Sequence, residues 1–181
     1  YGWCRLNFPY NCIVTIRHRE AMLQCSNNSV LQTQESLITY PIETSALDLS
    51  YNNIVHFEVN IQGRYDGIES NTYFEINMLE WLYINHNKLT TLPDGLFQGL
   101  RVLYWLALNG NQLITLNDSI FSGLTSLNFL CLENNMFTTL PGGVFRGLIV
   151  LWSLDLYGNQ LVTLNERSFI GLTNLTLLSL N

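Results

Sequence analysis

The chain has 181 residues, with 14 acidic and 8 basic side chains and a formal net charge of −6, and its length suits a single domain. The negative charge argues against nucleic acid or an anionic membrane as the main partner. No apolar run reaches the roughly 18–20 residues of a membrane-spanning helix, and the chain begins at Tyr1 without a signal-peptide pattern, so we expect a mature or trimmed start.

Residues 1–43 hold three of the four cysteines and predict a disulfide-stapled N-terminal cap in an oxidising, extracellular compartment. Two β-prone runs on either side of residues 18–20 predict a hairpin. A bridge between Cys12 and Cys25 would clamp this hairpin, and it is the pairing that we favour. A Cys4–Cys12 bridge, with a buried thiol left over, stays open.

Three sequons make Asn27, Asn117 and Asn174 candidate glycosylation sites. Roughly three such triplets would arise by chance in a chain this rich in Asn, Ser and Thr, so they add little to the argument for an extracellular compartment.

Residues 44–181 carry a repeated pattern of leucines. The first unit starts at Thr44, and the second starts 35 residues later at Leu79, whereas every later unit is 24 residues long. The extra residues form an insertion at about 58–72. We weigh a tolerated surface loop, which costs little free energy, against a functional binding loop.

From Leu79 onward, four complete units follow without slippage, and a fifth is incomplete. A period of 20–29 residues with this inner spacing is the signature of leucine-rich repeats. The leucine runs predict short parallel strands with the leucines pointing into the core. Two further ladders are expected: asparagines that bond the backbone of their own and neighbouring coils, and convex-side aromatics that stack as a spine. They comprise Asn52, Asn87, Asn111, Asn135 and Asn159, and Tyr73, Phe97, Phe121, Phe145 and Phe169.

Strand positions between the leucines are expected to face outward on the concave side of the sheet. Five units supply 25 such positions. Eight of the 25 are aromatic, which is 32%, whereas aromatic residues make up 12% of the whole chain. They are Tyr51, Trp81, Tyr83, Tyr104, Trp105, Phe129, Trp152 and Tyr157. Because exposed Tyr and Trp dominate binding hot spots, this strip predicts a ligand site. The alternative is that some rings cover one another or tuck against the rim.

The same 25 positions hold four acids and no Lys or Arg, the acids being Asp48, Glu80, Glu133 and Asp155. An acidic, aromatic floor favours a basic protein patch or a glycan, and disfavours phosphate-rich or sulfated ligands. The alternative is general acidity that serves solubility.

His86 and Cys131 also occupy outward positions. His86 is a candidate ligand contact or pH-sensitive residue, with a plain exposed histidine as the alternative. Cys131 is expected to be a small apolar surface residue, with intermolecular pairing as the alternative.

Enzyme activity is not expected. The sequence contains no H-E-x-x-H, G-x-S-x-G or phosphate-binding loop, and its three histidines are too scattered to propose a metal site. We therefore predict no catalytic residue, no metal and no cofactor.

The unit L-x-x-L-x-L-x-x-N-x-L-x-x-L-P-x-x-x-F-x-x-L, matched by residues 127–148, resembles that of extracellular leucine-rich-repeat proteins. It is similar to the ectodomains of Toll-like receptors and to the variable lymphocyte receptors of jawless vertebrates. The resemblance implies an α/β-type leucine-rich-repeat solenoid: a curved right-handed coil, a parallel sheet on the concave face, an irregular or 3-10 convex side and a β-hairpin cap. The usual cysteine pattern of the N-terminal cap is incomplete and the C-terminal cysteine cap is absent, so we expect a fragment of a longer protein.

The resemblance and the outward strip together predict an innate-immune-receptor-like module, secreted or on the cell surface, that binds a protein or glycan. The alternative is a structural or adhesive matrix protein that works through its lateral surfaces or by forming a homodimer. The residues expected to contact the ligand are Trp81, Tyr83, His86, Tyr104, Trp105, Phe129, Glu133, Trp152, Asp155 and Tyr157.

Overall fold

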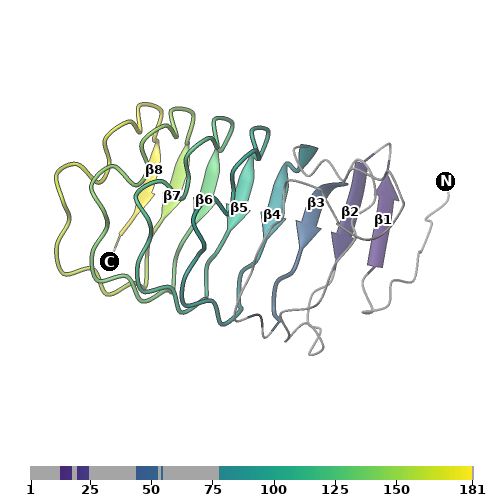
Figure 1. The fold of residues 1–181 in the computed structure, drawn as a ribbon, viewed down its shortest axis with the longest axis horizontal. Helices are drawn as coiled ribbons and strands as arrows, with labels where there is room; N and C mark the ends of the chain where they lie inside the picture. Colours follow the sequence, from purple (N-terminus) through teal and green to yellow (C-terminus); the bar gives the residue numbers. More distant parts are fainter. Residues whose placement is uncertain (1–12, 18–19, 25–43, 53, 55–77, 181) are drawn as a thin grey trace.

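The computed structural model describes residues 13–17, 20–24, 44–52, 54 and 78–180, and all structural statements below concern this part of the chain (Figure 1). It forms one sheet whose eight strands follow each other in chain order. The strands are β1 (Ile13–Arg17), β2 (Glu20–Gln24), β3 (Thr44–Asp48), β4 (Trp81–Tyr83), β5 (Trp105–Ala107), β6 (Phe129–Cys131), β7 (Ser153–Asp155) and β8 (Leu177–Ser179). Turns and irregular segments connect the strands of the repeats, so the coils stack as a solenoid with little helix, as predicted.

The first two strands form the predicted cap hairpin. β1 and β2 pair antiparallel, with Arg17 opposite Glu20 at the turn. β2 then pairs parallel with β3, so the hairpin adds two strands to the end of the repeat sheet. Cys4, Cys12 and Cys25 lie outside the described residues, and the favoured Cys12–Cys25 bridge stays a prediction.

Strand register confirms the unequal unit lengths. Leu47 of β3 pairs with Leu82 of β4, an offset of 35 residues, and Leu82 pairs with Leu106 of β5, an offset of 24. The later strands keep the offset of 24. The additional residues of the first unit must therefore lie between β3 and β4, and the predicted insertion at 58–72 is outside the described part.

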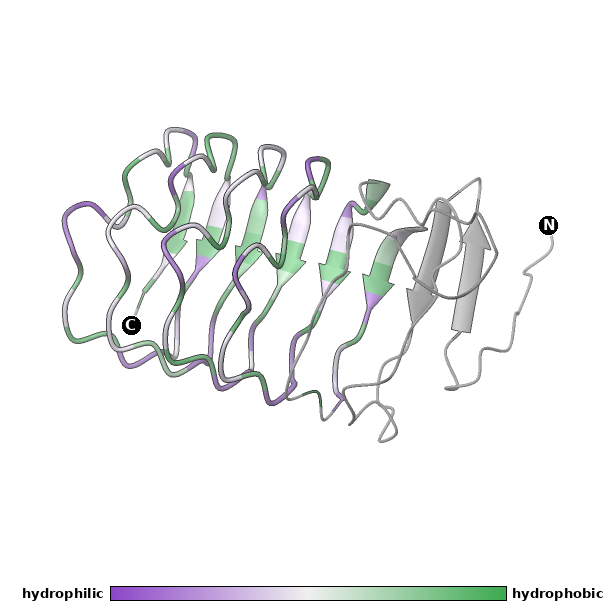
Figure 2. Ribbon diagram, viewed as in Figure 1, coloured by the Kyte–Doolittle hydropathy of each residue, from purple (hydrophilic) through white to green (hydrophobic). Residues whose placement is uncertain are grey.

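The core lies on one side of the sheet. Along β4 the central Leu82 is 1% exposed, while its neighbours Trp81 and Tyr83 on the opposite face are half-buried. Figure 2 shows the hydrophobic centre of each repeat strand. Since alternate residues of a strand point to opposite faces, the leucines fix which residues face outward.

The asparagine ladder ties each coil to the one before it. Asn111 Nδ2 donates to the carbonyl of Leu108 in its own coil and to that of Ile84 in the preceding coil, both at 3.0 Å. Its Oδ1 accepts from the backbone N–H of Leu89 at 3.1 Å. Asn87, Asn135 and Asn159 repeat this pattern, as predicted.

The predicted aromatic spine is present along the convex side. Phe97, Phe121, Phe145 and Phe169 stack in succession, with centroid separations of 6.2, 6.0 and 6.1 Å. Tyr73, the expected first member, lies outside the described residues. The sheet and the spine together hold successive coils in register and leave one face of the sheet free of core contacts.

No helix in the described residues combines the length and hydropathy of a membrane span.

Candidate ligand-binding face

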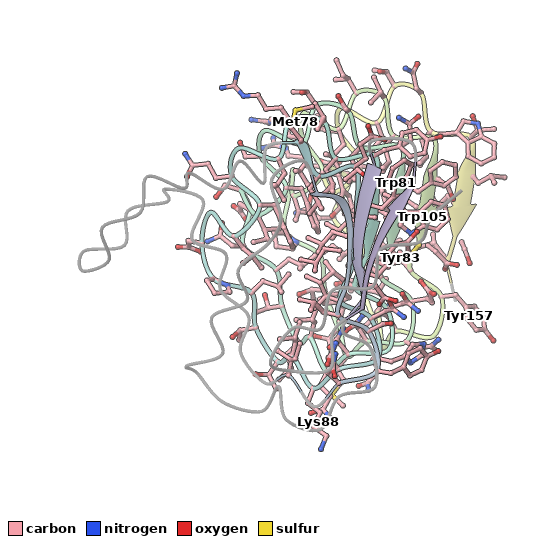
Figure 3. The ribbon with its side chains drawn as sticks, turned by 90° about the vertical axis from the view of Figure 1, so that its right-hand side faces the viewer. Met78, Trp81, Tyr83, Lys88, Trp105 and Tyr157 are labelled. Atoms are coloured by element: carbon pink, nitrogen blue, oxygen red, sulfur yellow. The ribbon has the colours of Figure 1, made fainter. Side chains whose placement is uncertain are left out.

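The outer face of the sheet, defined as the face opposite the leucine core, carries the residues predicted to bind a ligand. In the edge-on view of Figure 3, Trp81, Tyr83, Trp105 and Tyr157 all project from this side of the sheet. Parallel register places Trp81 beside Trp105 and Trp105 beside Phe129 on successive strands. The repeat thus converts residues 24 apart in sequence into direct neighbours.

Phe129 is the centre of a group of four rings on this face. It stacks on Trp105, with centroids 4.6 Å apart and planes inclined by 21°. Tyr104 meets it at 5.4 Å and Trp152 at 5.5 Å, both in steeply inclined arrangements. We call Tyr104, Trp105, Phe129 and Trp152 the aromatic cluster. Such offset and inclined pairs are the favourable geometries for aromatic rings.

Ring packing leaves the cluster only partly exposed. Trp105 and Phe129 are half-buried because they cover one another, whereas Tyr104 and Trp152 at the margins keep 40% and 41% of their surface exposed. Packing therefore accounts for part of the enrichment in aromatic residues. What remains is a preorganised apolar ridge with two exposed margins, which suits binding without a large loss of side-chain entropy.

Acidic groups lie at the other end of the same strands. Asp155 is the direct neighbour of Cys131 across β6 and β7, and Glu133 follows two residues after Cys131. Burial raises the pKa of the Glu133 carboxyl, a hydrogen bond from its own backbone N–H lowers it, and the negative charge of Asp155 raises it. The two carboxylates are therefore close enough to repel each other.

No Lys or Arg lies on this face within the repeats from residue 78 to 180. The repeat positions of Lys88, Arg101, Arg146 and Arg167 all fall outside the outward strand positions. Lys88 projects well away from Trp81, Tyr83 and Trp105 in Figure 3. The negative charge of Glu133 and Asp155 is consequently not offset by any neighbouring Lys or Arg of these repeats.

Cys131 lies in the middle of this acidic region, and its thiol is expected to be unreactive. Its thiol is half-buried, and burial, followed by the charges of Glu133 and Asp155, raises its pKa to about 12. Tyr83 has a raised pKa from burial, then from Asp48 and Cys131. Both groups are neutral at physiological pH, and a thiol in this state is a poor nucleophile.

Three buried polar atoms of this face have no hydrogen-bond partner within the described chain: Trp105 Nε1, Asn85 Oδ1 and Glu133 Oε2. An unsatisfied buried polar group costs roughly 1–3 kcal/mol, which a ligand group of the opposite kind can offset. One donor and two acceptors are thus buried beneath this face without a partner in the described chain.

His86 belongs to a structural column at the ends of the strands rather than to the aromatic cluster. Its ring stacks on Tyr51, with centroids 4.3 Å apart. Both residues have positive φ, 54° and 55°, as do Gly110, Asn134 and Gly158 at the same position of the later units. The imidazole of His86 packs against Gly110. A Cβ added to Gly110 would lie 2.5 Å from the imidazole Nδ1.

Periodicity alone does not predict two features of the face. The aromatic strip includes Tyr51, but the stacking of Tyr51 on His86 depends on side-chain orientation. Ala107, which is 5% exposed, lies on the strand between those of Tyr83 and Cys131 and pairs with both residues, so the outer face is low at this point.

The predicted glycosylation sites are described in two of three cases. Asn117 is exposed, and its Oδ1 accepts from the backbone and hydroxyl of Ser119, while its Nδ2 donates to Asp94 at 2.7 Å. Asn174 is also exposed. Asn27 lies outside the described residues, and glycosylation stays a prediction. No group of three His, Cys, Asp or Glu side chains among the described residues has a geometry suited to a metal ion.

The sequence matches the family model described as leucine rich repeat over residues 77–137 and 130–181. Comparison with the curated proteins gives no match. Among solved structures, the chain is similar to Toll-like receptor 13 in its complex with the single-stranded RNA ssRNA13, at 33% identity and a TM-score of 0.65. That alignment covers 76% of this chain and 18% of the receptor chain.

A second similar structure is that of Drosophila Toll in its complex with Spatzle, at 27% identity and a TM-score of 0.69. Here 89% of this chain and 20% of the Toll chain are covered, so this chain spans about a fifth of either receptor. These likenesses confirm the predicted resemblance to Toll-like receptor ectodomains. The family model covers more than half of the sequence, and the chain belongs to the leucine-rich-repeat family.

Proposed function

We propose that this chain is a ligand-recognition module of an immune-receptor-like protein, and that it binds its ligand on the outer face of the sheet. The aromatic cluster carries the proposal. Four packed rings, two of them about 40% exposed, form an apolar ridge that water disfavours and that a partner surface could cover.

The similar receptors support a binding role. Both were solved in complex with a ligand, one with single-stranded RNA and the other with Spatzle. Their likeness also supports an extracellular or endosomal location for this chain. Since neither alignment covers more than a fifth of the receptor, the likeness supports the role of the module and not the identity of its ligand.

Charge is our reason for preferring one of the ligand classes that these relatives suggest. The fold itself is compatible with RNA, as Toll-like receptor 13 illustrates. Nucleic acid is held chiefly through Lys and Arg at its phosphates, and the outer face of the described repeats has acids in their place. We therefore propose a protein or glycan ligand and no nucleic acid.

The test is a protein and glycan array probed with the purified chain and with two variants. Trp105→Ala removes a ring from the middle of the cluster, and Ile114→Ala removes an exposed apolar side chain, 55% exposed, from outside the outer face. We expect array binding that Trp105→Ala abolishes and Ile114→Ala leaves unchanged.

Thermal melting of both variants shows whether they remain folded. Binding that survives in a folded Trp105→Ala variant, but is lost after changes within residues 58–72 or at the flanks, would contradict the outer-face site and favour the adhesive alternative.

A further inference from the structure

We infer that the ligand is a protein, and that it places an apolar side chain on the aromatic cluster and a lysine or arginine beside Glu133 and Asp155. The inference rests on the proposed function, since it names the partner of the same face. Three observations carry it: how the rings are packed, where the uncompensated acids lie, and how far apart the two regions are.

Ring packing favours a protein over a glycan. A sugar ring binds an aromatic residue by lying on its open π-face, where the C–H groups meet the negative side of the quadrupole. Phe129 stacks with Trp105 on the preceding coil and contacts Trp152 on the following coil at 5.5 Å. The stacked contact therefore occupies one face of Trp105 and one face of Phe129, which leaves less open π-face at the centre of the cluster for a sugar ring, while its exposed margins suit aliphatic or aromatic side chains of a protein.

The acidic region formed by Glu133 and Asp155 favours a cationic group on the ligand. Glu133 and Asp155 repel each other, and Glu133 Oε2 is buried without a hydrogen-bond partner in the described chain. The outward positions of the repeats provide no Lys or Arg to offset this charge. An ammonium or guanidinium group beside the two carboxylates would offset the charge of the pair and could form the stronger, charge-assisted type of hydrogen bond with it.

Spacing then joins the two regions into one docking surface. Phe129, Cys131 and Glu133 occupy alternate positions of one coil, and alternate residues of an extended segment are about 7 Å apart. Asp155 lies on the strand next to Cys131. An extended ligand segment would therefore reach both regions with a basic residue two to four positions from an apolar one.

Neutral isosteres provide the test. Glu133→Gln and Asp155→Asn together remove two charges, and the amide oxygen of an asparagine can still accept from the backbone N–H of Tyr157, as Asp155 Oδ1 does at 3.0 Å. Asp94→Asn with Glu166→Gln is the matched control, because both acids are exposed and lie off the outer face. The probe is an immobilised array of random 12-residue peptides, run beside the glycan array.

We expect the wild-type chain and the control to select peptides with Lys or Arg two to four positions from an apolar residue. Affinity for these peptides should fall at least tenfold in the Glu133→Gln, Asp155→Asn variant. Absence of basic peptides from the selected set, or equal selection by that variant, would overturn the inference. Glycan binding that depends on Trp105 would also overturn it while leaving the proposed function intact, whereas a folded Trp105→Ala variant that binds every probe as the wild type does would contradict both.

Discussion

The indole of Trp105 lies against the ring of Phe129, with centroids 4.6 Å apart and an interplanar angle of 21°. The two residues are 24 positions apart and become neighbours because β5 and β6 pair in parallel at an offset of one repeat. The contact makes the centre of the outer face a packed surface rather than a set of free side chains.

This contact should be measurable as a coupling energy. A double-mutant cycle of Trp105→Ala and Phe129→Ala, followed by urea unfolding, is expected to give an interaction of about 0.5–1.5 kcal/mol in favour of the native pair. Tyr104→Ala combined with Ile114→Ala serves as a control with no shared contact and should be additive. Additivity of the Trp105 and Phe129 substitutions would mean that the stacking does not stabilise the fold.

The asparagine ladder should contribute more to stability than any surface residue. Asn111→Ala leaves the buried N–H of Leu89 without its acceptor, at roughly 1–3 kcal/mol. It also removes one of the two side-chain donors to each of the carbonyls of Ile84 and Leu108, which keep Asn87 and Asn135 as donors. We expect a loss of about 1–3 kcal/mol in the free energy of unfolding. The exposed Asn174 gives the matched control, and Asn174→Ala should change stability by no more than about 0.5 kcal/mol.

Gly110 should resist substitution for two separable reasons. Its φ of 65° strains any residue with a Cβ, and the His86 imidazole occupies the space that a Cβ would need. Gly123→Ala tests strain alone, because Gly123 has φ of 89° and nothing within 4 Å of an added Cβ. We expect about 1–2 kcal/mol of destabilisation for Gly123→Ala and more for Gly110→Ala.

A second substitution separates the crowding from the strain. His86→Ala should recover part of the stability lost in Gly110→Ala, because it removes the ring that the new methyl group meets. No recovery in the double variant, measured by urea unfolding, would show that the imidazole does not restrict this position.

The thiol of Cys131 should react slowly in the folded protein. Its pKa rises from 9.0 to about 12, chiefly through burial, so at pH 9 the folded chain holds the neutral thiol while the unfolded chain holds about half thiolate. Stability from this group is complete below pH 9 and is lost as the pH rises from 9 toward 12. Iodoacetamide labelling at pH 9, followed by mass spectrometry of the peptide containing Cys131, should show labelling far slower in the native than in the urea-unfolded chain. Equal rates would contradict the assigned burial.

The fold was predictable because the 24-residue period determines both the burial and the register of each strand. Leu82, Leu106 and Leu130 recur at one period, so a single assignment fixes them all as core residues. The asparagine ladder followed from the same periodicity, since an amide just beyond each strand can reach two coils. The hairpin of β1 and β2 followed from β-prone runs around a polar turn.

The details of the outer face were less accessible from sequence. Periodicity places Trp105 and Phe129 on the same face, but ring orientation depends on side-chain rotamers that neighbours on both sides select. The column of positive φ does have a counterpart in the sequence: Gly110, Asn134 and Gly158, residue types that tolerate this conformation, share the repeat position of His86. Glu133 and Asp155 occupy different positions of neighbouring repeats, 22 residues apart instead of 24. The repeat period therefore does not predict that these two carboxylates repel each other.

Binding to the outer face is tested most directly by comparing two single-residue variants against one captured ligand. The dissociation constant of the strongest array ligand should be measured for Trp152→Ala, at the exposed margin of the aromatic cluster, and for Ile149→Ala, which is off the outer face and 53% exposed. We predict at least tenfold weaker binding for Trp152→Ala and no change for Ile149→Ala. Unchanged affinity for Trp152→Ala, with the native melting temperature retained, would contradict a binding site on the aromatic cluster.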